Sequence, residues 1–286
     1  MPELPEVETV VRGLQGLAGL SLIKLEINDS RVWFESEADP EDLYGKRLLE
    51  VSRRGKYLLL RFEEGRTLVQ HLRMTGKMLD SSSGIVPEEV RKGRGRKSGK
   101  GLQIRCSFRF PGKELWFFDT RRFGTLTLTH DEKRFFDNKK IAPDPILETE
   151  KAFACFNEKI GRSTKPMKTA LLDQSIVAGV GNIYADEVLF AAGIYPMLPA
   201  HKLKEPDRIW REVLRILGES ISLGGSTIRD YVNSNGTAGS FSELHKVYGR
   251  EGEPCVVCEG PIRKMVLGGR STHFCGVCQK RSRNDH

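Results

Sequence analysis

Four cysteines near the end of the sequence have the spacing of a metal site. They form two C-x2-C pairs, Cys255 with Cys258 and Cys275 with Cys278, separated by the 16 residues 259–274. Each pair can offer two thiolates to one tetrahedral ion, and this spacing is typical of zinc sites. Because four thiolates leave no open position for a substrate, we expect one zinc ion with a structural role.

The first ten residues, MPELPEVETV, admit two chemical interpretations. In the first they begin a helix that stops near Gly19, since Pro2 and Pro5 suit a turn that needs no N–H and the glutamates suit the positive end of the helix dipole. In the second, removal of Met1 makes Pro2 a free secondary amine beside Glu3. A terminal amine titrates near pH ~8, so a good fraction would be nucleophilic at neutral pH. These ten residues alone favour the helix.

Length and charge limit the class of protein. The chain has 286 residues, enough for two modest domains and an appendage, and 46 Lys and Arg against 38 Asp and Glu give a net charge of +8. This charge favours a polyanionic partner, nucleic acid before membrane. There is no 18-residue apolar run and no secretory signal, so we expect a cytoplasmic protein. In that reducing compartment Cys106 and Cys155 are expected to be small core residues rather than disulfide partners.

The chain changes character along its length. Short β-rich runs in 47–79 and 102–129, broken by RRG, EEG, TG and PGK turns, predict a β-sandwich domain over 1–130 with the first helix packed against it. Between these runs, the basic segment 91–100 is expected to be a solvated loop, with nonspecific phosphate contact as the second interpretation.

The second half has a helical period. The two prolines of IAPDPIL (141–147) predict a linker over 131–147. A helical domain over 148–240 and a zinc module over 241–286 are expected to follow. Asn182 stands where the N-cap of one helix is expected. The preceding GVGN lacks GxGxxG spacing and a feeding strand, so we expect no nucleotide cofactor, although a helix N-terminus there suits a phosphate.

Six separated segments together resemble the formamidopyrimidine-DNA glycosylases, bacterial enzymes that excise oxidised purines. They are PELPEVETV, GKYLLL, HLRMTGKM, DTRRFG, VGNIYADEVLFAAGI and, within the cysteine cluster, RSTHFC. The likeness extends from residue 2 to about residue 279 in the family's order. It implies an α+β fold with an N-terminal β-sandwich with flanking helices, a C-terminal helix–two-turns–helix domain and a zinc-finger β-hairpin, with DNA in the cleft between the domains. It also favours the amine interpretation of the first residues.

The resemblance implies four catalytic residues. Pro2 would attack the sugar C1′ and form a Schiff base, whose cation drives β- and then δ-elimination, while Glu3 would move protons at the ribose. Lys56 resembles the family's catalytic lysine. Without the other motifs, a lysine in a turn would be expected simply to lie in solvent. Arg270 matches an arginine that grips the phosphates of the flipped nucleotide.

Six further residues match family contacts to DNA. Flipping a base leaves a void in the duplex, and one set of side chains would fill it while the others contact phosphates. The void-filling set is Met74, Arg121 and Phe123, and the phosphate contacts are His71, Lys168 and Asn182. Each of four residues has a structural alternative. Met74 and Phe123 would pack within a strand, Arg121 would form a surface salt bridge, and His71 would be a core or half-buried residue.

The sequence departs from the family's pattern at two places. Residues 99–106 lack a histidine that the family usually places there, and Lys100 is the candidate substitute. Glu259 replaces the glycine that usually follows the second zinc cysteine. The segment 225–241 resembles the loop that covers the flipped base, with no single residue assigned a role.

These observations predict a bifunctional DNA glycosylase and AP lyase of base excision repair that acts on 8-oxoguanine and formamidopyrimidines. The expected partner is damaged double-stranded DNA, with no membrane and with the protein as a monomer. An endonuclease VIII-like enzyme for oxidised pyrimidines is one alternative, against which the PELPEVE start argues. A noncatalytic zinc-dependent damaged-DNA-binding protein is the other, if Met1 stays in place and blocks Pro2.

Overall fold

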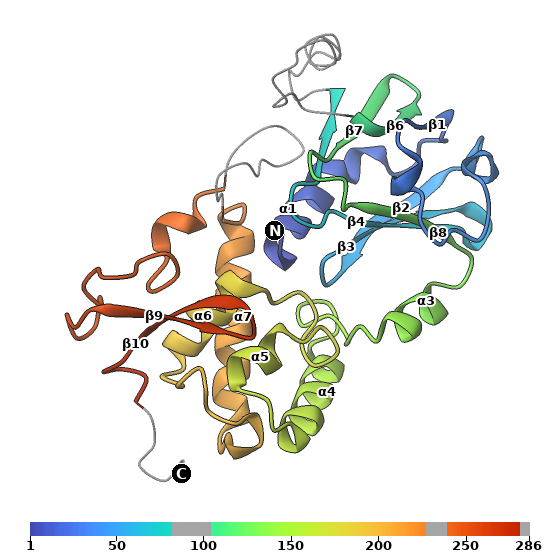
Figure 1. Cartoon of the computed structure of the whole chain (residues 1–286). Coiled ribbons are helices and arrows are strands. Elements are labelled where there is room, and N and C mark those ends of the chain that lie inside the picture. The colour runs from blue at the N-terminus through green and yellow to red at the C-terminus, as the bar shows by residue number, and fades with distance from the viewer. Residues whose placement is uncertain (82–103, 227–238, 281–286) are drawn as a thin grey trace. The chain divides into compact units, whose positions relative to one another are not determined.

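The computed structural model describes residues 1–81, 104–226 and 239–280. The chain divides into two compact units, one made of residues 1–139 and 224–240 and the other of residues 140–223 and 241–286. Figure 1 shows the first unit mainly in blue to green and the second mainly in yellow to red. None of the described helices is long and apolar enough to cross a membrane.

The first unit is a sandwich of two four-stranded antiparallel sheets, as expected (Figure 1). One sheet has the order β1 (Lys24–Ile27), β6 (Ile104–Phe110), β7 (Lys113–Phe118), β5 (Lys77–Asp80). The other has the order β2 (Leu48–Arg54), β3 (Tyr57–Phe62), β4 (Thr67–His71), β8 (Thr125–Thr129). Apolar side chains from both sheets form one core, because alternate residues of each strand point inward.

The predicted first helix is present as α1 (Leu4–Leu14), continued by the 3-10 turn η1 (Gln15–Leu17). Val7, Val10 and Leu14 are buried in the core of the sandwich, which explains the apolar stripe of the sequence. The other 3-10 turns of this unit are η2 (Ser30–Val32), η3 (Pro40–Leu43) and η4 (Glu63–Gly65).

Half of the predicted linker is a helix. The helix α3 (Glu132–Lys139) is fixed to the sandwich because the Arg61 guanidinium donates to both oxygens of Glu132, at 2.7 and 2.8 Å. Phe136 is fully buried, with its ring 5.6 Å from that of Tyr57 and 4.6 Å from the guanidinium of Arg54. The expectation of a linker over 131–147 is therefore wrong for these residues, since its two prolines lie beyond them.

The second unit is helical with a short β-hairpin. Its helices are α4 (Thr149–Arg162), α5 (Met167–Leu172), α6 (Asn182–Ala191) and α7 (Pro206–Ser222), with 3-10 turns η7 (Ala200–Lys202) and η8 (Phe241–Leu244). The hairpin consists of β9 (Ile262–Leu267) and β10 (Arg270–Cys275). The helix expected at 182 begins there, but Gly181 is its N-cap and Asn182 is its first helical residue. The prediction of Asn182 as the N-cap was thus wrong by one residue.

Residues 224–240 belong to the first unit. The predicted boundary at residue 240 instead placed them in the helical domain. The described ends of this segment meet in a bridge between Ser226 and Ser240. A Cβ on Gly239 would lie 2.3 Å from the carbonyl oxygen of Gly224, so only glycine permits this approach. Most of the predicted covering segment, 227–238, lies outside the described residues, as does the basic segment 91–100 with Lys100.

Candidate active site and nucleic-acid interface

The start of the chain is packed into the first unit. Pro2 is buried and Glu3 is 3% exposed. The Glu6 carboxylate accepts hydrogen bonds from the backbone N–H groups of Glu3 and Ser226, both at 2.7 Å. Glu6 therefore joins the backbone beside Pro2 to Ser226. With Met1 attached, the nitrogen of Pro2 is an amide, so nucleophilic chemistry at this atom requires removal of Met1.

Lys56 and His71 interact electrostatically in the same unit. Lys56 lies in the turn between β2 and β3 and is 5% exposed, while His71 ends β4 with its ring 4.6 Å from that of Tyr57. Burial, and then the charges of Arg73 and Lys56, lower the pKa of His71 to about 3. The backbone N–H of Arg73 donates to His71 Nδ1 at 2.9 Å. The ring is therefore neutral at physiological pH, with its proton on Nε2.

The three predicted void-filling side chains lie together. Met74, in the turn after β4, is 42% exposed, and Phe123, in the loop before β8, is 51% exposed. Arg121 joins them, because its Nη1 lies 3.1 Å from the sulfur of Met74 and its guanidinium carbon lies 4.9 Å from the centre of the Phe123 ring. Two loops thus present a thioether, a guanidinium and an aromatic ring as one exposed group, which we call the wedge cluster.

Arg270 begins β10 at the tip of the hairpin and is exposed. Gly268 and Gly269 form the two-residue turn before it, with φ of 57° and 72°. Two consecutive positive φ values define a turn that suits the twist of a hairpin and strongly favours glycine. The Gly-Gly pair therefore fixes the position of Arg270 as the first residue after the hairpin turn.

Lys168, predicted to contact phosphate, lies in a buried ion pair of the second unit. Its side chain and that of Asp186 are both 0% exposed, with Nζ 2.7 Å from Asp186 Oδ1 and 2.6 Å from the carbonyl oxygen of Ser271. Asp186 also accepts from the backbone N–H of His273 at 2.9 Å. These contacts join α5 and α6 to the start of β10, so the structure assigns Lys168 a part in holding the hairpin.

Asn182 reaches the same strand. Its Nδ2 donates to the hydroxyl of Ser271 at 3.3 Å, and its buried Oδ1 has no hydrogen-bond partner among the described residues.

The carboxylate of Glu187, the residue after Asp186 in α6, accepts from three successive backbone N–H groups, those of residues 246–248, at 2.8 to 3.0 Å. Burial raises the pKa of Glu187, although these three hydrogen bonds oppose the shift.

The four cysteines of the zinc motif converge in the second unit. Their sulfurs all lie within 4.8 Å of one another, with 3.8 Å between Cys255 and Cys278 and 3.4 Å between Cys258 and Cys275. A tetrahedral zinc with Zn–S bonds of about 2.3 Å requires sulfurs about 3.8 Å apart, so the cluster fits one zinc ion. Backbone N–H groups of Val257 and Cys278 point at two of the sulfurs, each at 3.4 Å, which favours thiolates.

The backbone at Glu259 has a conformation that favours glycine. Its φ is +63°, in the left-handed region that glycine adopts without strain, and its N–H donates to the carbonyl of Cys255 at 2.9 Å. A non-glycine residue there costs roughly 1 kcal/mol. The turn of the first zinc knuckle is nevertheless formed.

Three family models match consecutive parts of the chain. They describe the formamidopyrimidine-DNA glycosylase N-terminal domain over residues 1–126, the formamidopyrimidine-DNA glycosylase H2TH domain over 141–232, and a zinc finger found in FPG and IleRS over 252–281. The chain belongs to the formamidopyrimidine-DNA glycosylase family. Membership identifies it as a DNA glycosylase, an enzyme of DNA repair, with a structural zinc finger.

Curated relatives and solved structures agree over the full length. The formamidopyrimidine-DNA glycosylases of Streptococcus mutans and Thermus thermophilus are 42% and 39% identical, and the matches cover 98% of this chain and 100% and 98% of those proteins. The Lactococcus lactis Fpg (MutM) bound to DNA containing N7-benzyl-Fapy-dG has a TM-score of 0.84 at 36% identity, covering 98% of this chain and 100% of that one. The crystal structure of the Thermus thermophilus MutM (Fpg) protein has a TM-score of 0.82 at 39% identity, covering 97% and 98%.

The sequence interpretation missed the buried carboxylates that hold the site. Asp186 and Glu187, which the sequence analysis does not single out, are 0% and 4% exposed. One signal was available, because the helix that contains them is otherwise apolar, and adjacent acids in such a helix must find donors. Asp119 is likewise 1% exposed beside the arginines of DTRRFG.

The zinc cluster yields the first prediction. Cys275→Ser should reduce bound zinc from one ion per chain to a small fraction, because a hydroxyl is a poor substitute for a thiolate ligand. Metal content of the purified variant, measured by atomic spectroscopy, tests this. Cys155→Ser, which changes a half-buried cysteine outside the cluster, and Arg270→Ala, on the same hairpin, should both keep the metal. Full zinc content in Cys275→Ser would contradict the four-thiolate site.

The second prediction concerns His71. The unfolded chain protonates this histidine near pH 6.5, whereas the folded chain takes up the proton only near pH 3, so lowering the pH between these values destabilises the fold. The difference in unfolding free energy between the wild type and His71→Gln should therefore shrink as pH falls, by about 1.4 kcal/mol per pH unit below 6.5. Urea unfolding at pH 6 and pH 5 measures it. A difference that does not change with pH would show that His71 titrates normally in the folded protein.

Proposed function

We propose that this protein is a bifunctional DNA glycosylase and AP lyase that removes oxidised purines, 8-oxoguanine and formamidopyrimidines, from duplex DNA. The observation that carries the proposal is the wedge cluster, in which two loops present Met74, Arg121 and Phe123 as one exposed group. An enzyme that extrudes a base needs side chains that occupy the void and contact the orphaned partner. The relatives bound to Fapy-dG-containing DNA support the choice of oxidised purines.

The reaction starts at Pro2 after loss of Met1. The secondary amine attacks C1′ and gives up its proton, while the damaged base leaves with the electron pair of its bond to C1′ and gains a proton. The C1′–O4′ bond then breaks, O4′ takes a proton as the sugar ring opens, and an iminium remains between Pro2 and C1′. The cation withdraws electrons, so loss of a C2′ proton expels the 3′ phosphate, and a second elimination expels the 5′ phosphate. Glu3, held at 3% exposure next to Pro2, supplies and removes the protons at the ribose.

Cationic and neutral donors hold the phosphates. Lys56 and Arg270 contact the phosphates around the lesion, Lys56 also assisting proton transfer, and a guanidinium suits Arg270 because it can bind two phosphate oxygens. His71, neutral with its proton on Nε2, donates a hydrogen bond and needs no charge for this role. Asn182 lies at a helix N-terminus, where a phosphate is favoured. Lys168 belongs to the same set of proposed phosphate contacts, and its ammonium also contacts Asp186 and the carbonyl oxygen of Ser271.

The biological setting follows from the same proposal. The partner is damaged double-stranded DNA, on which the protein acts as a monomer in the cytoplasm, at the nucleoid. The two alternatives differ in outcome: an endonuclease VIII-like enzyme would prefer oxidised pyrimidines, and a noncatalytic damage-binding protein would bind lesions without cutting.

The third prediction tests the amine. Borohydride should fix the protein covalently to duplex DNA containing 8-oxoguanine, because it reduces the iminium to a stable amine, and intact mass should show a chain that begins at Pro2. The matched control is the same protein with an additional residue retained before Pro2, which should bind the lesion without cross-linking. An active preparation whose mass includes Met1 would exclude this mechanism.

The fourth prediction tests Glu3. Glu3→Gln preserves size and removes the carboxylate, so single-turnover excision should slow by roughly 10²–10⁴-fold while affinity for lesion DNA stays within a few-fold. Glu8→Gln is a suitable control, since Glu8 lies on the same helix and pairs with Arg12 and Arg53. Excision at the wild-type rate in Glu3→Gln would reduce Glu3 to a helix-end charge.

A further inference from the structure

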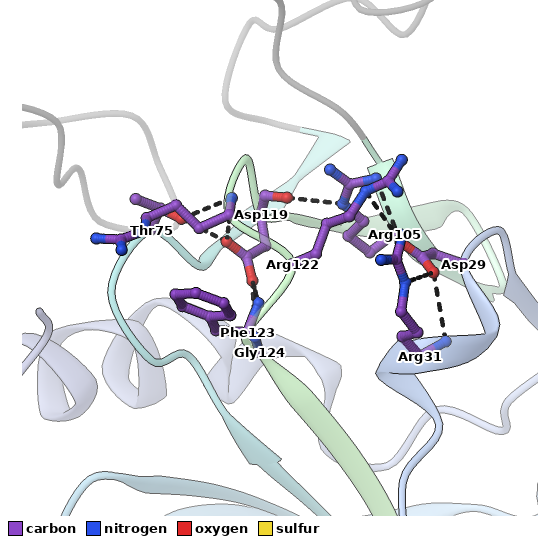
Figure 2. A network of polar contacts seen from close by, with 9 residues as sticks. Asp29, Arg31, Thr75, Arg105, Asp119, Arg122, Phe123 and Gly124 are labelled. Carbon is purple, nitrogen blue, oxygen red and sulfur yellow. Dashed lines mark hydrogen bonds and ion pairs between the residues drawn. The ribbon is translucent and has the colours of Figure 1, made fainter.

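The two loops that carry the wedge cluster meet at one buried carboxylate, that of Asp119. Its Oδ1 accepts from the Thr75 hydroxyl and from the backbone N–H of Arg121, the latter at 3.1 Å. Its Oδ2 accepts from the backbone N–H groups of Phe123 and Gly124, at 2.8 and 2.7 Å. Asp119 is 1% exposed, and these four donors come from both sides of the cluster. Figure 2 shows the carboxylate between Thr75 and the Phe123–Gly124 backbone.

A second group of contacts holds the same loop from the side (Figure 2). Arg105 Nε donates to the carbonyl oxygen of Asp119 at 2.6 Å, and Arg105 Nη1 donates to Asp29 Oδ2 at 3.4 Å. Asp29 also pairs with Arg122 Nε at 3.4 Å and with Arg31 Nε at 3.1 Å. Arg122, which lies between the two wedge residues of this loop, is thus turned away from the cluster toward Asp29.

The loop needs these contacts because its backbone is unusual. Arg122 has φ of +59°, a left-handed conformation that an arginine adopts only at a cost. At Gly124 a Cβ would lie 2.4 Å from the Phe117 ring and 3.2 Å from Asp119 Oδ2, so the chain passes the strand β7 too closely for any side chain. Residues 120–123 form no strand or helix, and their N–H groups therefore depend on other acceptors.

We propose that Asp119 is the positioning residue of the wedge, which fixes Met74, Arg121 and Phe123 in the arrangement that enters the duplex before DNA is bound. The inference rests on the proposed function, because it gives the wedge cluster a role in base extrusion. Asp119 itself touches no DNA in this proposal. It acts by joining the turn that bears Met74, through Thr75, to the backbone that bears Arg121 and Phe123, so that the three side chains move as one body.

A preorganised wedge has a kinetic consequence. The side chains must fill the void at the moment when the base leaves the stack. If the loop samples several conformations, only a fraction of the molecules has the wedge in place at that moment, and the rate of excision falls in proportion. Chemistry at an abasic site in single-stranded DNA has no stack to open and no partner base to contact. Loss of Asp119 should therefore slow excision from duplex DNA much more than reaction with a single-stranded abasic site.

The test compares Asp119→Asn and Asp119→Ala with Asp144→Asn. Asp144 is a matched control, since it is also 1% exposed and accepts two backbone N–H groups, those of Ile146 and Leu147, outside the proposed site. Three quantities are measured: the single-turnover rate on 8-oxoguanine opposite cytosine and opposite adenine, the fluorescence of 2-aminopurine placed beside the lesion, and borohydride trapping on a single-stranded abasic oligonucleotide. Thermal unfolding and zinc content verify that each variant is folded.

In Asp119→Ala we expect duplex excision to fall by about 10- to 10²-fold, since a misplacement of about 1 Å can cost about 10²-fold. The preference for cytosine over adenine should fall toward one, and the 2-aminopurine signal of stack opening should shrink. Asp119→Asn should lose less, because its remaining oxygen can still accept from Phe123 and Gly124. Trapping on the single-stranded site should be unchanged in both, and Asp144→Asn should match the wild type throughout.

The inference is overturned if folded Asp119→Asn and Asp119→Ala keep the wild-type duplex rate and base preference, or if single-stranded trapping falls as much as duplex excision. Failure of the proposed function has a different signature. Phe123→Ala would then excise from duplex DNA at the wild-type rate, or the wild type would not be trapped at all. If Phe123→Ala is slow and the Asp119 variants are not, the wedge stands and Asp119 is a fold residue.

Discussion

A buried backbone N–H must find an acceptor, and in the described parts of this protein buried carboxylates supply it for several segments outside helices and strands. Glu6 accepts from Glu3 and Ser226, Asp119 from the loop that bears Phe123, and Glu187 from residues 246–248. Asp186 does the same for the start of β10. One carboxylate can accept from several donors, so a single acid fixes several residues of a loop. The loops can then carry exposed functional side chains without strands or helices of their own.

This arrangement separates the charges of the molecule by function. In each unit, buried acids accept from N–H groups or, for Asp186, also from Lys168, whereas Arg121 of the first unit and Arg270 of the second are exposed. A chain with a net charge of +8 can therefore offer cations to a polyanion while its neighbouring carboxylates are directed inward. Burial raises the pKa of Asp29, but the hydrogen bonds and charges of Arg31 and the charge of Arg122 outweigh this and lower it. Asp29 thus stays ionised and keeps Arg122 beside it.

The second unit uses a metal and a rigid turn for the same purpose. A zinc ion bound by Cys255, Cys258, Cys275 and Cys278 would hold the two knuckles from which β9 and β10 extend. Gly268 and Gly269 close the hairpin in a conformation that few other residues adopt. The ion pair of Lys168 with Asp186 fixes the start of β10 to the helices, through Ser271 and His273. Three unrelated features thus converge on the strand that begins with Arg270.

The sequence alone determined the zinc ligands, the sandwich, the first helix, the helical character of the second half and the family. Each of these is encoded locally: cysteine spacing, the two-residue period of strands, the 3.6-residue period of helices, and contiguous motifs such as PELPEVETV. The tertiary structure decided what the intervening polar residues do. It made a helix of residues 132–139 because Arg61, 71 residues before Glu132, offers a two-point contact. It also placed Lys168 in a buried pair and gave Asp119 donors from a turn 44 residues away. A polar side chain has no periodicity that reveals its partner, since the partner is set by which distant segments pack together.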